Sequence, residues 1–158
     1  MKGLKLVINL LEVLSFGALL VLVVFFAMSY SVLPKSLPHI QIAQNSWIQF
    51  NTKDVLIGLF WVGFLFYSIL FALRRFPSLH MYPVKITVEN VEIQVHLSRL
   101  FIGLVKLIGM GGILLLFLHV YYFFNEGVLQ NLLKEFIATL ALMLLCLVVY
   151  IPVARHYR

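Results

Sequence analysis

The chain has 158 residues, of which 63% are hydrophobic and 11% are charged, and its formal net charge is +6. The charged fraction is about half that of an ordinary globular domain. This composition excludes a soluble globular protein. It predicts an all-α membrane protein with one transmembrane domain over residues 1–158.

Four long apolar runs are predicted to be transmembrane helices, since a helix needs about 20 mostly apolar residues to cross a hydrocarbon core ~30 Å thick. The runs are continuous and do not alternate, which is typical of helices and not of barrel strands. The first run is too long for a cleavable signal peptide, and the fourth is expected to stop at Pro152, because proline cannot continue a helix. The four runs cover roughly Leu4–Tyr30, Val55–Leu73, Leu97–Phe124 and Val128–Pro152.

The connection between the first two runs, residues 31–54, is unusually apolar for a free linker. Pro34 and Pro38 disfavour a helix at its start. Two interpretations stay open: a connector that lies in the membrane interface, or a docking surface for an extracytoplasmic peptide or protein. His39 and Trp47 are the candidate docking residues.

Lysine and arginine predict the orientation, because they accumulate in cytoplasmic segments. Both termini and the connection between the second and third runs are basic, and the opposite side of the membrane has only Lys35, Lys53 and Lys134. We therefore expect both termini and the middle connection in the cytoplasm. The same bias predicts contact with the lipid bilayer and with anionic lipid headgroups, and it does not indicate nucleic-acid binding.

The segment before the third run predicts an amphipathic cytoplasmic extension of that helix. Thr87 is a natural N-cap, and the valines that follow lie on one side at helical spacing. A second side carries a candidate polar face, which we interpret as solvated and salt-bridged; a metal held by its Glu–His pair is the less favoured alternative. The valines are Val88, Val91 and Val95, and the polar face is Glu89, Glu92, His96 and Arg99.

A motif in this region resembles a known family. Its residues run Tyr82-Pro83-Val84-Lys85-Ile86-Thr87, then Glu89-Asn90, Gln94, Arg99 and Lys106, and Leu33-Pro34 to Pro38-His39 matches the outer loop in part. The pattern is similar to small bacterial integral membrane proteins that carry a domain of unknown function shared with the immunity protein against the sporulation-delaying peptide toxin. The resemblance implies a bacterial inner-membrane protein that meets a peptide or protein partner.

Glu12 and Lys106 are ionisable residues well inside the first and third predicted spans, where a charge is costly unless it is paired or hydrated. Glu12 is seven residues past Lys5, and Lys106 is seven past Arg99, so both lie roughly 10 Å from the cytoplasmic end. Gly103 and Gly109 flank Lys106 at helical spacing and permit close helix approach. We predict an ion pair between Glu12 and Lys106, with snorkelling of Lys106 to the headgroups as the alternative.

The sequence lacks the motifs of an enzyme. No convergent set of nucleophile, base and metal ligands is evident, and the single cysteine, Cys146, excludes an intramolecular disulfide. We expect no catalytic residue, cofactor or metal. The favoured function is binding of a protein or peptide partner, in an immunity, signalling or accessory-subunit role. The alternatives are a homo-oligomeric transporter or channel with Glu12 and Lys106 at its site and, less favoured, a lipid-modifying enzyme.

Overall fold

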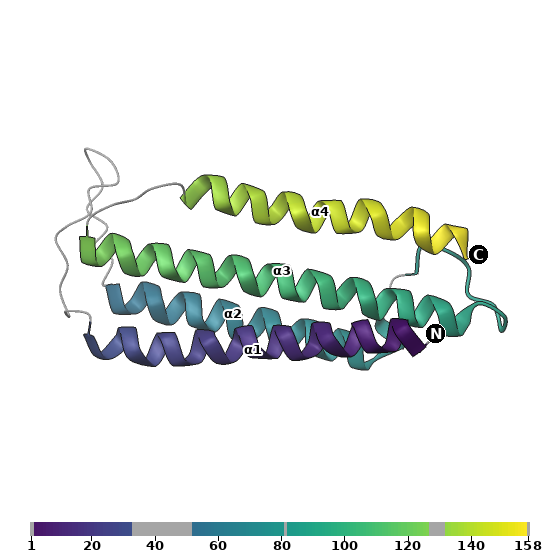
Figure 1. Ribbon diagram of the computed structural model, residues 1–158, viewed down its shortest axis with the longest axis horizontal. Helices are drawn as coiled ribbons and strands as arrows, with labels where there is room; N and C mark the ends of the chain where they lie inside the picture. Colours follow the sequence, from purple (N-terminus) through teal and green to yellow (C-terminus); the bar gives the residue numbers. More distant parts are fainter. Residues whose placement is uncertain (1, 33–51, 81, 127–131, 158) are drawn as a thin grey trace.

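The computed structural model describes residues 2–32, 52–80, 82–126 and 132–157, and these form four long helices and one short 3-10 helix (Figure 1). Each long helix is long and apolar enough to cross a membrane. The predicted all-α class with four potential membrane spans is thereby confirmed. The candidate docking residues His39 and Trp47 lie outside the described residues. The elements are α1 (Lys2–Val32), α2 (Thr52–Arg75), η1 (Pro77–Leu79), α3 (Val91–Glu126) and α4 (Leu132–His156).

The expectation that the fourth helix stops at Pro152 is wrong, because α4 continues through this proline to His156. Pro152 lacks a backbone N–H, so the carbonyl of Val148 loses its helical donor, and the loss of this one bond does not end the helix. Gln94 of α3 holds the last turn that follows: its side-chain amide donates to the carbonyl oxygens of Ala154 at 2.8 Å and of Tyr157 at 3.1 Å, which have no donor within the helix because the helix ends there. The expected start at Val128 falls outside the described residues.

The start of α3 follows the predicted cap. The backbone N–H of Asn90 donates to the Thr87 hydroxyl at 3.3 Å, and the backbone N–H of Thr87 donates to the Asn90 side-chain oxygen at 2.8 Å. This reciprocal arrangement satisfies two otherwise free donors at the helix start. The asparagine amide also donates to the carbonyl of Lys85, which fixes the preceding chain against the cap.

The helices form a three-helix core with the fourth helix on its outside. In Figure 1, α3 lies between α4 on one side and α1 and α2 on the other. Helices α1, α2 and α3 pack against each other, and α4 packs chiefly against α3. Both chain ends and the connection from α2 to α3 lie at the same end of the bundle. We call this the basic end, because it carries Lys5, Arg74, Arg75, Lys85, Arg99 and Arg155.

The opposite half of the three-helix core is apolar and aromatic. Leu22, Leu56, Met110 and Phe117 are fully buried there. The rings of Phe26 on α1 and Phe60 on α2 stack with centroids 4.6 Å apart. Aromatic stacking and apolar packing therefore close the bundle at the end away from the termini.

Glycines of α3 set how closely its neighbours approach. A Cβ on Gly109 would lie 2.3 Å from the Phe66 ring of α2 and 2.7 Å from the Met143 side chain of α4. A Cβ on Gly112 would lie 2.4 Å from Thr139 of α4. Small residues at helix interfaces permit such approach in membranes, so Gly109 and Gly112 serve the packing of α3 against its neighbours.

We predict that Gly112→Ala destabilises the protein, because the added methyl group overlaps Thr139. Overpacking of this kind costs about 1–3 kcal/mol. Gly111→Ala is the matched control, since a Cβ there meets nothing within 4 Å and alanine favours the helix. Thermal unfolding in detergent should show a lower midpoint for Gly112→Ala and an unchanged or higher one for Gly111→Ala. Equal midpoints would contradict the close packing of α3 and α4.

Candidate functional site: a buried ion-pair cluster and its pocket

The predicted ion pair is present, and it has a third member. The Lys106 ammonium of α3 donates to Glu12 Oε1 of α1, and the Arg74 guanidinium of α2 pairs with the same oxygen. Lys106 is fully buried, whereas the side chains of Glu12 and Arg74 are 17% and 19% exposed. One carboxylate thus holds two cations and joins all three core helices. We call Glu12, Arg74 and Lys106 the ion-pair cluster.

Two aromatic rings of α2 complete the surroundings of Lys106. Its ammonium lies 4.7 Å from the Tyr67 ring centroid and 5.7 Å from that of Phe71. Ring faces attract cations, most strongly where water is excluded. The Lys106 ammonium is therefore enclosed by a carboxylate and two rings and does not snorkel to the headgroups.

The ion-pair cluster lies at the level where α2 ends and its two neighbours continue. Arg74 is the second-to-last residue of α2. Beyond the cluster, α1 extends from Glu12 to Lys2 and α3 extends from Lys106 to Val91. At about 1.5 Å per residue these extensions are roughly 15 Å and 22 Å long. Leu11 of α1 lies against Gly103 of α3, 3.4 Å from where a Cβ would be, so the two helices run close together beside the cluster.

A basic pocket opens where α2 stops. One cavity of about 370 Å³ is lined by Phe71, Arg74, Arg75 and Arg99. A second cavity of about 270 Å³ shares two of these arginines, and its lining is Lys5, Ile8, Asn9, Arg74, His96 and Arg99. The two cavities meet at Arg74 and Arg99, and together we call them the arginine pocket.

The predicted polar face at the start of α3 is not one solvated face. Glu89 and Glu92 are exposed, but His96 is buried and Arg99 is half-buried. The His96 ring is held by the carbonyl of Glu92 at 2.7 Å, so Glu92 and His96 do not pair through their charged groups. The prediction failed because the sequence did not show that α1 and α2 cover this side of α3. On the valine side, Val88 and Val91 are exposed, whereas Val95 is half-buried.

His80 closes the end of α2 just outside the membrane spans. Its Nε2 lies 2.8 Å from the carbonyl oxygen of Leu73, which can only accept, so this nitrogen carries the proton. Its Nδ1 faces the Tyr82 hydroxyl at 3.3 Å. Burial lowers the pKa of His80, and the nearby Arg99 charge lowers it further, against an opposing effect of the Leu73 hydrogen bond. Burial raises the pKa of Tyr82, so both groups are neutral at pH 7.

The side chains at the basic end are suited to binding a charged group. Within the part of the chain that the structure describes, no group of three or more His, Cys, Asp or Glu residues could hold a metal ion. The arginine pocket presents guanidinium donors, which suit carboxylates and phosphates. Its carboxylate neighbour Glu12 is already engaged by two cations.

Comparison with family models, with curated proteins and with solved structures finds no match to this chain. The resemblance of the Tyr82–Lys106 region to the toxin-immunity family therefore stays a prediction.

We predict that Glu12→Gln is far more destabilising than Lys106→Met. Removal of the carboxylate leaves a buried ammonium and a guanidinium without a counter-charge, at a cost of about 3–5 kcal/mol. Removal of the lysine leaves Glu12 with Arg74 and puts an apolar group into an enclosed site. The Glu12→Gln/Lys106→Met double variant should recover most of the loss. Unfolding by denaturant in detergent tests this ranking, and a double variant as unstable as Glu12→Gln would contradict the coupling.

We predict that stability falls as the pH drops below about 6.5, the ordinary pKa of histidine. The folded pKa of His80 is lowered, so in this range the unfolded chain binds a proton that the folded protein does not. Unfolding therefore becomes more favourable as the pH falls. His80→Gln should flatten the pH dependence of the unfolding midpoint between pH 7.5 and 5. An identical slope in the variant would assign the effect to other histidines.

Proposed function

We propose that the protein acts by binding the membrane-embedded helix of a protein or peptide partner along the open side between α3 and α4. The observation that carries this proposal is the peripheral position of α4. In the most apolar stretch of each helix, 39% of α3 is buried but 0% of α4 is. A helix of a closed four-helix bundle packs between two neighbours, whereas α4 packs chiefly against one.

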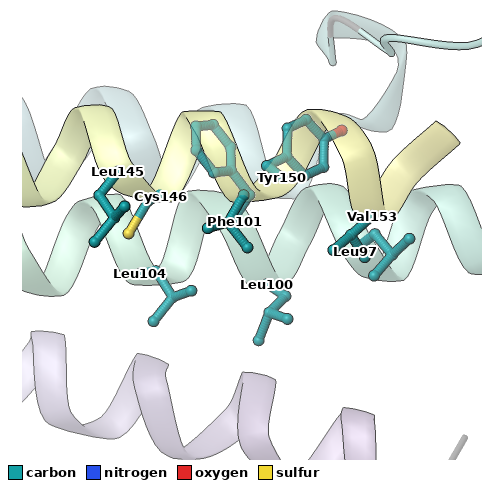
Figure 2. Close-up of a pocket in the computed structure, with 9 residues that line it drawn as sticks. Leu97, Leu100, Phe101, Leu104, Leu145, Cys146, Tyr150 and Val153 are labelled. Carbon is teal, nitrogen blue, oxygen red and sulfur yellow. The ribbon is translucent and has the colours of Figure 1, made fainter. Parts of the chain in front are cut away.

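An apolar cavity marks the binding position. It has a volume of about 250 Å³, and its lining comes from α3 and α4 alone. Figure 2 shows Leu100 and Leu104 extending from α3 away from α4, while Leu145 and Cys146 lie on the α4 side. The rings of Phe101 on α3 and Tyr150 on α4 stack with centroids 4.6 Å apart and so join the two helices. The lining is Leu97, Leu100, Phe101, Leu104, Leu145, Cys146, Val149, Tyr150 and Val153.

The proposal includes an orientation and a location. The basic end lies in the cytoplasm, because lysine and arginine concentrate on that side of membrane proteins. Glu12, paired with two cations, then lies near the cytoplasmic side of the membrane. The motif from Tyr82 to Lys106 supports a bacterial cytoplasmic membrane and an immunity, signalling or accessory role.

The channel or transporter interpretation has less support. Lys106 is fully buried and enclosed by Glu12, Tyr67 and Phe71. A transported ion or substrate would have to separate this cluster, which also holds α1, α2 and α3 together. A homo-oligomeric transport path at Glu12 and Lys106 is therefore the second candidate.

A crosslinking experiment tests partner binding. A diazirine-bearing amino acid is placed at Leu145, which lines the cavity, or at Val148, which does not. These side chains are 56% and 63% exposed, so random encounters with lipid or protein should label both equally. We expect a protein adduct of discrete mass at Leu145 that is at least five-fold weaker at Val148, and Cys146→Phe should reduce it by filling the cavity.

Two results would contradict the proposal. Equal adducts at Leu145 and Val148 would show that the α3–α4 side has no preferred occupant. An adduct unaffected by Cys146→Phe would place the partner outside the cavity. An adduct at twice the mass of this chain would identify the bound helix as one from a second copy.

A further inference from the structure

Positive charge at the arginine pocket exceeds the negative charge available to neutralise it. Glu12 is shared by Arg74 and Lys106, and Glu92 lies 4.0 Å from Lys5 with both side chains more than half exposed. Among the described residues, neither Arg75 nor Arg99 has a carboxylate within 4.0 Å. The pocket therefore contains guanidinium groups that no acidic side chain of the described chain neutralises.

Arg99 has a donor without a protein acceptor. Its Nε is buried, and no hydrogen-bond acceptor is present for it among the described residues. Leaving a buried charged donor without a partner costs free energy that a bound acceptor would recover. The Arg99 side chain lines both cavities, so its unpartnered donor adds to the case that the charge of the pocket makes for a bound anion.

The location of the pocket selects the kind of anion. Arg74 and Arg75 form the end of the membrane-spanning segment of α2, so the pocket lies where apolar chain gives way to the basic end. Phe71 adds an apolar wall next to the three arginines. A phospholipid headgroup presents a phosphate at this depth with hydrocarbon beside it. Guanidinium groups bind phosphate oxygens by paired hydrogen bonds, which ammonium groups cannot reproduce.

We infer that the arginine pocket binds the phosphate of an anionic phospholipid, with Arg75 and Arg99 as the principal donors and Arg74 shared with Glu12. The bound headgroup supplies the counter-charge that Glu12 alone does not. It would occupy the space beyond the end of α2, between the extensions of α1 and α3. This site is separate from the α3–α4 cavity, so the two proposals stand or fall independently.

Native mass spectrometry of the full-length chain in detergent micelles tests the inference. The probes are phosphatidylglycerol, with net-neutral phosphatidylcholine as the comparison. We expect tighter binding of phosphatidylglycerol and a loss of affinity of about tenfold or more for Arg99→Gln and for Arg75→Gln. Arg75 is exposed, so its variant should fold even if Arg99→Gln does not. Arg75→Lys keeps the charge but should lose several-fold in affinity.

Matched controls separate a built site from general attraction. Lys85 and Arg155 lie at the same end and line a different cavity, so Lys85→Gln and Arg155→Gln remove the same charge without touching the arginine pocket. We expect changes of about twofold or less for both. Equal losses for all four glutamine variants, or no preference for phosphatidylglycerol, would overturn the inference in favour of diffuse attraction.

A second arm distinguishes the source of the phosphate. Inorganic phosphate at millimolar concentration is added to the lipid-bound chain. We expect it to leave phosphatidylglycerol bound, because it lacks the acyl chains that pack beside Phe71. If it displaced the lipid and its own binding depended on Arg75 and Arg99, the pocket would be a site for a soluble phosphate, and the assignment to a lipid would be wrong.

Discussion

The Glu12 carboxylate is the interaction on which the arrangement of the core helices depends. It accepts a hydrogen bond from Lys106 on α3 and forms an ion pair with Arg74 on α2, so a single side chain of α1 fixes the rotation and depth of two neighbours. Apolar packing between helices in a bilayer gives little directional preference, because lipid tails are as apolar as leucine. A buried charge that must find its partner gives a strong one. The apolar half of the bundle contributes close packing, and the ion-pair cluster sets the register of the three core helices.

The cluster carries more positive than negative charge, and this imbalance links the core to the surface. Of the two cations that pair with Glu12, Lys106 is enclosed and has no contact with water, and the other cation lies nearer the end of the bundle. Arg74 fills that position, and Arg75 and Arg99 surround it. Because α2 ends at Arg75 while α1 and α3 continue, the arginines line a recess and are not spread along a helix surface.

The sequence predicted the spans, the cap at Thr87 and the pairing of Glu12 with Lys106, because length, local capping and equal depth are properties of one or two segments. Arg74 could have been added from its spacing, since Tyr67, Phe71 and Arg74 recur on one side of α2. The burial of His96 could not be predicted, because it depends on which helices cover that side of α3. The last turn of α4, beyond Pro152, is held by Gln94, 58 residues before the proline, and such a distant partner leaves no local signal. The predicted role of His39 and Trp47 concerns residues outside those described.

The double engagement of Glu12 also bears on how the chain enters the membrane during synthesis. Helices leave the ribosome in chain order, so α1 arrives with a carboxylate in its apolar stretch long before Lys106 has been translated. Arg74, at the end of α2, becomes available first. We expect the α1–α2 hairpin to neutralise Glu12 on its own, which spares the insertion machinery a lone acidic group at depth. Lys106 then inserts next to a Glu12 carboxylate that is already in position, and the ion pair they form fixes the depth of the third helix in the bilayer.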